Sequence, residues 1–155
     1  MWIYIDPMGF EPMVDLRALS FCGLFSIMAR GGYAYFITFI AGLSRYGYVY
    51  LMKYKSKVFE IFKKFEAKGQ NQTGKSIKIL RSDRGDEYLR TKFVDYLKVC
   101  GIVSNLTPPY TPQLNGVAKH RNRTLLNMVR SMLIYTDLPI SLWGYVILFT
   151  IYLIN

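Results

Sequence analysis

Apolar residues along the chain fall into runs whose spacing separates strands from helices. The run 33–40 is aromatic and β-branched, which predicts a buried strand. Residues 46–52 are similar, with tyrosines at alternate positions, and 41–45 supplies a turn between the two runs. The two strands are therefore predicted to pair as a hairpin, with the alternating tyrosines packing across it.

Helical spacing begins at 56–68. Val58, Phe62 and Phe65 recur every three or four residues, and lysines occupy the positions between them. This pattern predicts an amphipathic helix whose lysines face solvent. Glycines and polar residues in 69–74 predict the loop that follows it.

The middle of the chain then alternates strands with a helix. Residues 77–80 predict a short strand, and 102–104 predict another. Between them, 87–99 predicts a helix that closes near Gly101, because glycine is the usual residue just past a helix end.

A long helix is predicted near the end of the chain. Asn115 is its expected cap, it runs to about Tyr135, and Pro139 opens a final helix. The order of strands and helices predicts an α/β domain with a mixed sheet over 14–155. Residues 1–13 fit no element and are predicted to be an irregular N-terminal segment.

Composition narrows the class of partner. The 155 residues suffice for one domain, and 52% of them are apolar, so the chain can bury a core and is not disordered. The net charge of +10 favours a polyanionic partner, either nucleic acid or an anionic membrane, over a merely soluble basic protein. We favour nucleic acid.

Several classes of site are not predicted. Cys22 and Cys100 form no metal-binding or disulfide pattern, and His120 is the only histidine. The start of the chain, 1–12, lacks the basic n-region of a signal peptide. The apolar segment 142–154 is too short to cross a bilayer, so no membrane partner is expected.

The most distinctive motif is a proline-pinned polar loop at 107–117, which reads Thr-Pro-Pro-Tyr-Thr-Pro-Gln-Leu-Asn-Gly-Val. It leads into the predicted long helix, whose first turn contains Lys119. Asp83 lies before this loop in the sequence, at the end of the predicted strand that begins at residue 77, in the run Arg-Ser-Asp-Arg-Gly. Strand ends and helix starts are where α/β sheets place their chemistry. Carboxylates at such points are what a pair of divalent ions needs for phosphoryl transfer.

A series of motifs, in order along the chain, resembles the catalytic core of copia-type retrotransposon integrases, which are part of a Gag-Pol polyprotein. The motifs are 31–33, 44–51, 80–85, 87–88, 111–117, 121–126, 137–139 and 143–144. The resemblance implies an RNase H-like fold, truncated at its C-terminal end, with a mixed five-stranded sheet flanked by helices. It also implies cutting and joining of double-stranded DNA in the nucleus with Mg²⁺ or Mn²⁺, and assembly as a homo-oligomer.

Family members carry an Asp, Asp, Glu catalytic triad. Carried over residue by residue, the second Asp is Asp83, whereas the first Asp and the Glu align with Ser20 and Lys119. Two of three metal ligands are therefore replaced, and an ammonium at 119 would repel a dication. We expect metal binding at Asp83 to be weak and catalysis to be impaired. Asp86 or Glu87 could supply a ligand for one weak magnesium site.

Basic residues recur along one arc of the predicted long helix, opposite an apolar stripe. The arc is either a solvated face or a DNA track, and its start at the motif loop favours the track. Phosphate contacts of this kind are independent of sequence. The candidate nucleic-acid-binding residues are Lys119, Arg121, Arg123, Arg130, Gln113 and Asn115.

Three functions therefore compete. An active nuclease and strand transferase predicts metal-dependent nicking of DNA. A DNA-binding remnant predicts salt-dependent binding that a chelator does not change. A decayed gene product predicts the absence of a cooperative melt. We favour an integrase core that keeps its scaffold and some DNA affinity with little or no catalysis.

Overall fold

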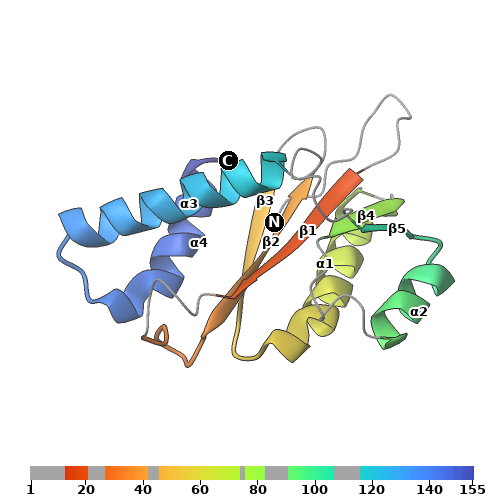
Figure 1. Ribbon diagram of the computed structural model, residues 1–155, viewed down its shortest axis with the longest axis horizontal. Coiled ribbons are helices and arrows are strands. Elements are labelled where there is room, and N and C mark those ends of the chain that lie inside the picture. Colours follow the sequence, from red (N-terminus) through yellow and green to blue (C-terminus); the bar gives the residue numbers. More distant parts are fainter. Residues whose placement is uncertain (1–12, 21–26, 42–45, 74–75, 83–90, 107–115) are drawn as a thin grey trace.

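One mixed sheet of five strands organises the computed structural model, which describes residues 13–20, 27–41, 46–73, 76–82, 91–106 and 116–155 (Figure 1). The strands are β1 (Met13–Ser20), β2 (Tyr35–Ala41), β3 (Gly47–Met52), β4 (Ile79–Ser82) and β5 (Val103–Leu106). Their order across the sheet is β3-β2-β1-β4-β5. The β1–β2 and β2–β3 pairs are antiparallel, and the β1–β4 and β4–β5 pairs are parallel. The predicted mixed sheet is confirmed.

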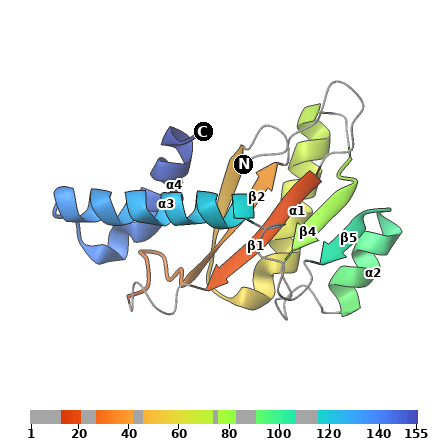
Figure 2. The same ribbon diagram turned by 45° about the horizontal axis from the view of Figure 1, so that its top comes forward.

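Helices cover both faces of this sheet. They are α1 (Val58–Thr73), α2 (Thr91–Val99), α3 (Gly116–Tyr135) and α4 (Trp143–Leu153), with 3-10 turns η1 (Lys55–Lys57) and η3 (Ile140–Leu142) before α1 and α4. Figures 1 and 2 show α1 and α2 on one side of the sheet and α3 and α4 on the other. In the part of the chain that the structure describes, no helix combines the length and the apolar character that crossing a membrane requires.

Two predicted boundaries differ from the structure. The loop predicted at 69–74 is wrong, because α1 continues to Thr73 and buries Gly69 within it. Tertiary packing there outweighs the low helix propensity of glycine. Met13 belongs to β1 and not to an irregular segment. The predictions for residues 1–12, and for the start of the helix predicted at 87–99, lie outside the described ranges.

Aromatic rings fill the layer between the sheet and the α1 side. Phe39 of β2 stacks on Phe65 of α1, with 4.2 Å between ring centroids. Phe62 of α1 meets the edge of Phe93 of α2 at 5.2 Å. This α1 cluster joins β2, α1 and α2 into one core. Its buried members are Ile37, Phe39, Met52, Val58, Phe62, Phe65, Ile77, Leu80, Phe93, Leu97 and Ile102.

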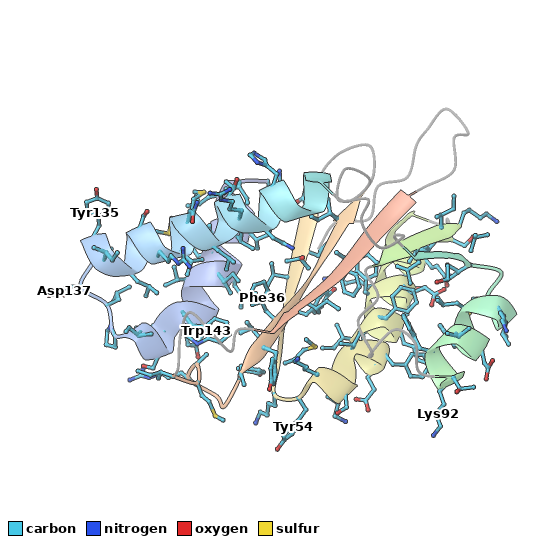
Figure 3. All side chains as sticks on the ribbon, in the orientation of Figure 1. Phe36, Tyr54, Lys92, Tyr135, Asp137 and Trp143 are labelled. Carbon is cyan, nitrogen blue, oxygen red and sulfur yellow. The ribbon has the colours of Figure 1, made fainter. Side chains whose placement is uncertain are left out.

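The opposite layer centres on Trp143, at the start of α4. Its ring faces Phe36 of β2, with 6.4 Å between ring centroids (Figure 3). Its indole Nε1 donates a hydrogen bond to the carbonyl of Ile27 at 3.1 Å, so the polar end of the ring is satisfied. Three buried residues of α3 join this α4 cluster at four-residue intervals: Leu125, Val129 and Leu133.

The backbone of α4 approaches the sheet closely at Gly144. A Cβ atom at this position would lie 3.0 Å from the Cβ of Ala29 and 3.1 Å from a methyl group of Leu51 in β3. Distances this short leave no room for a side chain unless a neighbour moves. The absence of a side chain at 144 therefore allows α4 to pack on β3.

A single buried hydrogen bond fixes α3 against β2. Thr38, which is 2% exposed, donates from Oγ1 to Oδ1 of Asn122 at 2.9 Å, and Asn122 is 3% exposed. The Nδ2 of Asn122 is buried without a partner. A polar pair in an apolar layer fixes the relative position of two elements, because a shift would leave both groups unsatisfied.

Glu66 is a second buried polar group, on the other side of the sheet. It is 4% exposed and accepts a hydrogen bond from Oη of Tyr96 at 2.7 Å. Burial, together with this hydrogen bond, raises the pKa of Tyr96 above its ordinary value. The pair links α1 to α2 and lies on the face of the sheet opposite to α3.

We expect Phe62→Ala to lower the free energy of unfolding by about 3–5 kcal/mol, because it removes a fully buried ring and leaves a cavity. Urea denaturation followed by circular dichroism measures the change. Tyr152→Ala is the matched control, because it also removes an aromatic ring but at a side chain that is 76% exposed. Equal losses in the two variants would contradict the assignment of Phe62 to the core.

A double-mutant cycle tests the Thr38–Asn122 hydrogen bond. We expect Thr38→Val to cost about 1–3 kcal/mol, because it leaves the buried Oδ1 of Asn122 unpaired. Adding Asn122→Leu should cost less than the sum of the two single changes, with a coupling of about 0.5–3 kcal/mol. Strictly additive unfolding free energies would show that the pair does not fix α3.

Candidate nucleic-acid interface

The end of β4 lies beside the middle of β1. Ser82, the last residue of β4, pairs with Leu16 of β1 and with Leu106 of β5. Asp83 follows Ser82 directly but lies outside the described ranges. An early strand, β1, therefore lies beside the strand that precedes Asp83.

Ser20 of β1 does not lie beside the end of β4. It pairs with Tyr35 of β2, four positions beyond Leu16, which is about 13 Å along a strand. Tyr35 packs against the α1 cluster. The residue that follows Leu16 is Arg17, and it pairs with Thr38, the partner of Asn122 in α3. The backbone register thus places Arg17, and not Ser20, in a row that α3 covers.

The start of α3 lies near the same rows. Lys119 is the fourth residue of α3, and Asn122 follows one turn later. Asn122 meets β2 at Thr38, so the second turn of α3 lies against β2. The approach of Lys119 to the end of β4 stays a prediction.

The residues at these positions do not fit a two-metal centre. Ser20 offers a neutral hydroxyl, Lys119 an ammonium, and the first turn of α3 contains no acid. Among the residues whose placement is described, no three His, Cys, Asp or Glu side chains group as metal ligands. Magnesium and manganese require anionic oxygen ligands.

Arg121 has a role within the fold that its sequence pattern did not reveal. Its Nη2 donates to the carbonyl of Ile154 at 2.9 Å and to Oδ1 of Asn155 at 3.0 Å. Burial lowers the pKa of its guanidinium, and its Nε is buried without a partner. A cation at the C-terminal end of α4 is favourable because the helix dipole is negative there. Contact of Arg121 with DNA stays a prediction.

Asn155 extends this contact to the sheet. Its Nδ2 donates to the carbonyl of Gly47 at 3.2 Å, and the amide of Gly47 approaches its Oδ1 at 3.4 Å. Arg121, Asn155 and Gly47 therefore connect α3, the end of α4 and the start of β3. We call these three residues the Arg121 clamp. The contacts span 33 to 108 residues along the chain, so helical spacing alone could not have shown them.

The remaining basic groups of α3 face outward. His120 and Arg123 are exposed, and Arg130 is half-buried with its Nη1 3.5 Å from Oδ1 of Asn127. We call His120, Arg123 and Arg130 the α3 surface. Gln113 and Asn115, the other predicted DNA contacts, lie outside the described ranges. The α3 surface can form phosphate contacts without help from a metal.

Sequence relatives of this chain are retrotransposon polyproteins. It is 45% identical over 143 residues to the retrovirus-related Pol polyprotein from transposon TNT 1-94 of Nicotiana tabacum, which covers 92% of this chain and 11% of that protein. It is 32% identical over 129 residues to the retrovirus-related Pol polyprotein from transposon RE2 of Arabidopsis thaliana; the match covers 83% of this chain and 9% of that protein. It is 30% identical over 137 residues to the transposon Ty1-NL2 Gag-Pol polyprotein of Saccharomyces cerevisiae; the match covers 87% of this chain and 8% of that protein.

The chain thus spans about a tenth of the length of the curated relatives it matches. No protein-family model matches it.

Solved structures with a similar fold are retroviral integrases. An integrase chain of the simian T-cell lymphotropic virus intasome, solved with the PP2A regulatory subunit B56 gamma, matches 92% of this chain and 48% of its own length at a TM-score of 0.68. The HTLV-2 integrase catalytic core domain, solved with magnesium in a trimeric form, matches 92% of this chain and 84% of its own length at a TM-score of 0.63. Both are 14% identical in sequence, so this likeness shows the fold.

The sequence relatives and the shared fold agree with each other, and the RNase H-like prediction is confirmed. This chain belongs to the Pol polyproteins of copia-type retrotransposons, and it has the fold of a retroviral integrase catalytic core domain.

Proposed function

We propose that this integrase core binds double-stranded DNA through the α3 surface and Lys119 without carrying out two-metal strand transfer. The observation that supports the proposal most directly is the start of α3. Its first turn contains no acid, and Lys119 stands where the family resemblance places the catalytic Glu. Exposed Arg123 and His120 continue along the same helix.

Charge determines which partner this region can hold. An ammonium repels a dication that would sit within a few ångströms, because screening is weak in a partly dry site. The same ammonium attracts a phosphate oxygen. Lysine and arginine side chains that neutralise phosphates release condensed counterions, which makes the binding strong at low salt and independent of base sequence.

Assembly with further copies is part of this proposal. One structural neighbour is a chain of an intasome, and another was solved in a trimeric form. These likenesses support a nucleoprotein complex of several copies, acting on duplex DNA in the nucleus. Magnesium accompanies the HTLV-2 core domain, whereas the donor set of this chain argues against a comparable pair of ions here.

The first prediction concerns DNA affinity. We expect the unmodified chain to bind a fluorescent 20-base-pair duplex with an affinity that falls steeply with salt and does not change with EDTA. Arg123→Gln with Arg130→Gln should reduce the slope of log K against log salt by about 2, because each lost phosphate contact removes about 0.9. Fluorescence anisotropy over a salt series measures both quantities.

Lys78→Gln with Lys98→Gln is the matched control for this measurement. Both lysines are exposed, neither lies on α3, and the net charge falls by the same amount. An equal loss of affinity in the control would show a non-specific effect of net charge and would contradict a DNA site on α3. Binding that EDTA abolishes would contradict the metal-free mechanism.

The second prediction concerns restored metal binding. We expect no Mn²⁺-dependent rise in melting temperature and no nicking of a model DNA end by the unmodified chain. Ser20→Asp with Lys119→Glu should show both, because two carboxylates replace a hydroxyl and an ammonium. Differential scanning fluorimetry with and without MnCl₂ reports binding independently of activity.

Arg17→Asp with Lys119→Glu is the companion variant. It places the new carboxylate in the row of Thr38, as the backbone register indicates, whereas Ser20→Asp follows the family resemblance. A response in only one variant identifies which position of β1 supplies the first ligand. Nicking by the unmodified chain that disappears in Asp83→Ala would overturn the proposed loss of catalysis.

A further inference from the structure

A second basic surface lies on the opposite face of the sheet from α3. Its five residues, which we call the lysine surface, are Lys55, Lys57, Lys63, Lys64 and Lys68. All five side chains are exposed. Between residues 53 and 71 the acids are Glu66, which is buried, and Glu60, which pairs with Lys57 at 2.8 Å. The exposed charge of this segment is therefore strongly positive.

Aromatic rings hold several of these ammonium groups in place. Nζ of Lys63 lies 4.3 Å from the ring centroid of Phe59 and 4.9 Å from that of Tyr96. Nζ of Lys55 lies 5.6 Å from the ring of Tyr35. Cation–π contacts restrict lysine side chains that would otherwise move freely. When a partner binds, these lysine side chains lose less conformational entropy than unrestrained lysines would lose.

The other lysines follow a line that suits an extended polyanion. Lys57, Lys64 and Lys68 are separated by seven and four residues, so they recur on one line along the outer side of α1. The eleven steps from Lys57, at the end of η1, to Lys68 span about 16 Å. Duplex DNA carries one negative charge for about every 1.7 Å of its axis, so several phosphates lie within that length.

The sheet separates the lysine surface from the α3 surface. The α1 helix packs on Phe39 of β2 through its Phe65, whereas α3 meets the other face of β2 at Thr38. Figures 1 and 2 show the two helices on opposite sides of the strands. Tyr54, which precedes Lys55, is 65% exposed and projects away from the body of the molecule (Figure 3).

We propose that the lysine surface binds the sugar–phosphate backbone of a second duplex, distinct from the one that contacts α3. Lysine ammonium groups are compact point charges without the fork geometry that reads bases, so this contact is independent of sequence. A chain with two phosphate-binding faces can hold two duplex segments on either side of one sheet. This inference concerns a site separate from the proposed function of α3.

A triple variant tests the surface itself. Lys63→Gln, Lys64→Gln and Lys68→Gln remove three charges from lysines outside the Lys57–Glu60 pair. Arg30→Gln, Lys78→Gln and Lys98→Gln form the control, with the same loss of charge at exposed positions elsewhere. We expect the first variant to reduce the salt slope for a 20-base-pair duplex by about 2.7, at about 0.9 for each contact, and the control to change it by less than one contact. Equal reductions would overturn the proposal, provided that thermal melts show both variants folded.

A bridging assay separates the two faces. Donor-labelled and acceptor-labelled duplexes should give energy transfer when the unmodified chain is added, and the signal should disappear in the lysine-surface variant. That variant should still bind one duplex through α3. The Arg123→Gln, Arg130→Gln variant should retain binding of one duplex at the lysine surface, so failure of the α3 proposal remains distinguishable.

Persistence of energy transfer in the lysine-surface variant would show that one duplex does not lie there and would overturn the inference. Competition provides a second criterion. A polyglutamate peptide of equal charge should displace the duplex from the lysine surface of the Arg123→Gln, Arg130→Gln variant much less well than unlabelled duplex does. Equal displacement would assign the surface to acidic polypeptides and would also overturn the inference.

Discussion

The docking of α3 against β2 sets the position of the basic groups on that helix. The Thr38–Asn122 hydrogen bond fixes the helix at its second turn, in a layer that is otherwise apolar. The Arg121 clamp fixes the same part of α3 to the ends of α4 and β3. Both contacts lie within one helical turn of Lys119. Lys119 therefore lies next to two contacts that hold α3 in place.

The two apolar clusters of this scaffold do not include Ser20 or Lys119, the positions at which we propose that metal ligands were lost. The α1 cluster and the α4 cluster are built from apolar side chains of strands and helices, and the buried carboxylate Glu66 is satisfied by Tyr96 far from α3. Loss of a metal-binding carboxylate also removes repulsion between like charges. The proposed loss of metal ligands is therefore compatible with this fold.

Local pattern predicted the elements well wherever periodicity and packing agree. The aromatic hairpin and the helix that ends at Tyr135 follow directly from residue spacing. The extension of α1 through Gly69 could not be predicted, because burial of that turn overrides the propensity of a single glycine. The Arg121 clamp was also missed, since it joins residues that are distant in sequence. Motif alignment placed Ser20 at the site, whereas strand pairing puts Arg17 beside Thr38, and only backbone register reveals that difference.

Gly144 has a wider consequence for the architecture. Because α4 approaches Ala29 and Leu51 so closely there, this one position sets the spacing between the helix and the sheet. Even a methyl group would force either Leu51 to rotate or α4 to move outward. Outward movement of α4 would carry the carbonyl of Ile154 with it, and the guanidinium of Arg121 would lose its acceptor. The smallest residue of the layer thus controls, through a rigid helix, the tightness of a contact at the far end of that helix.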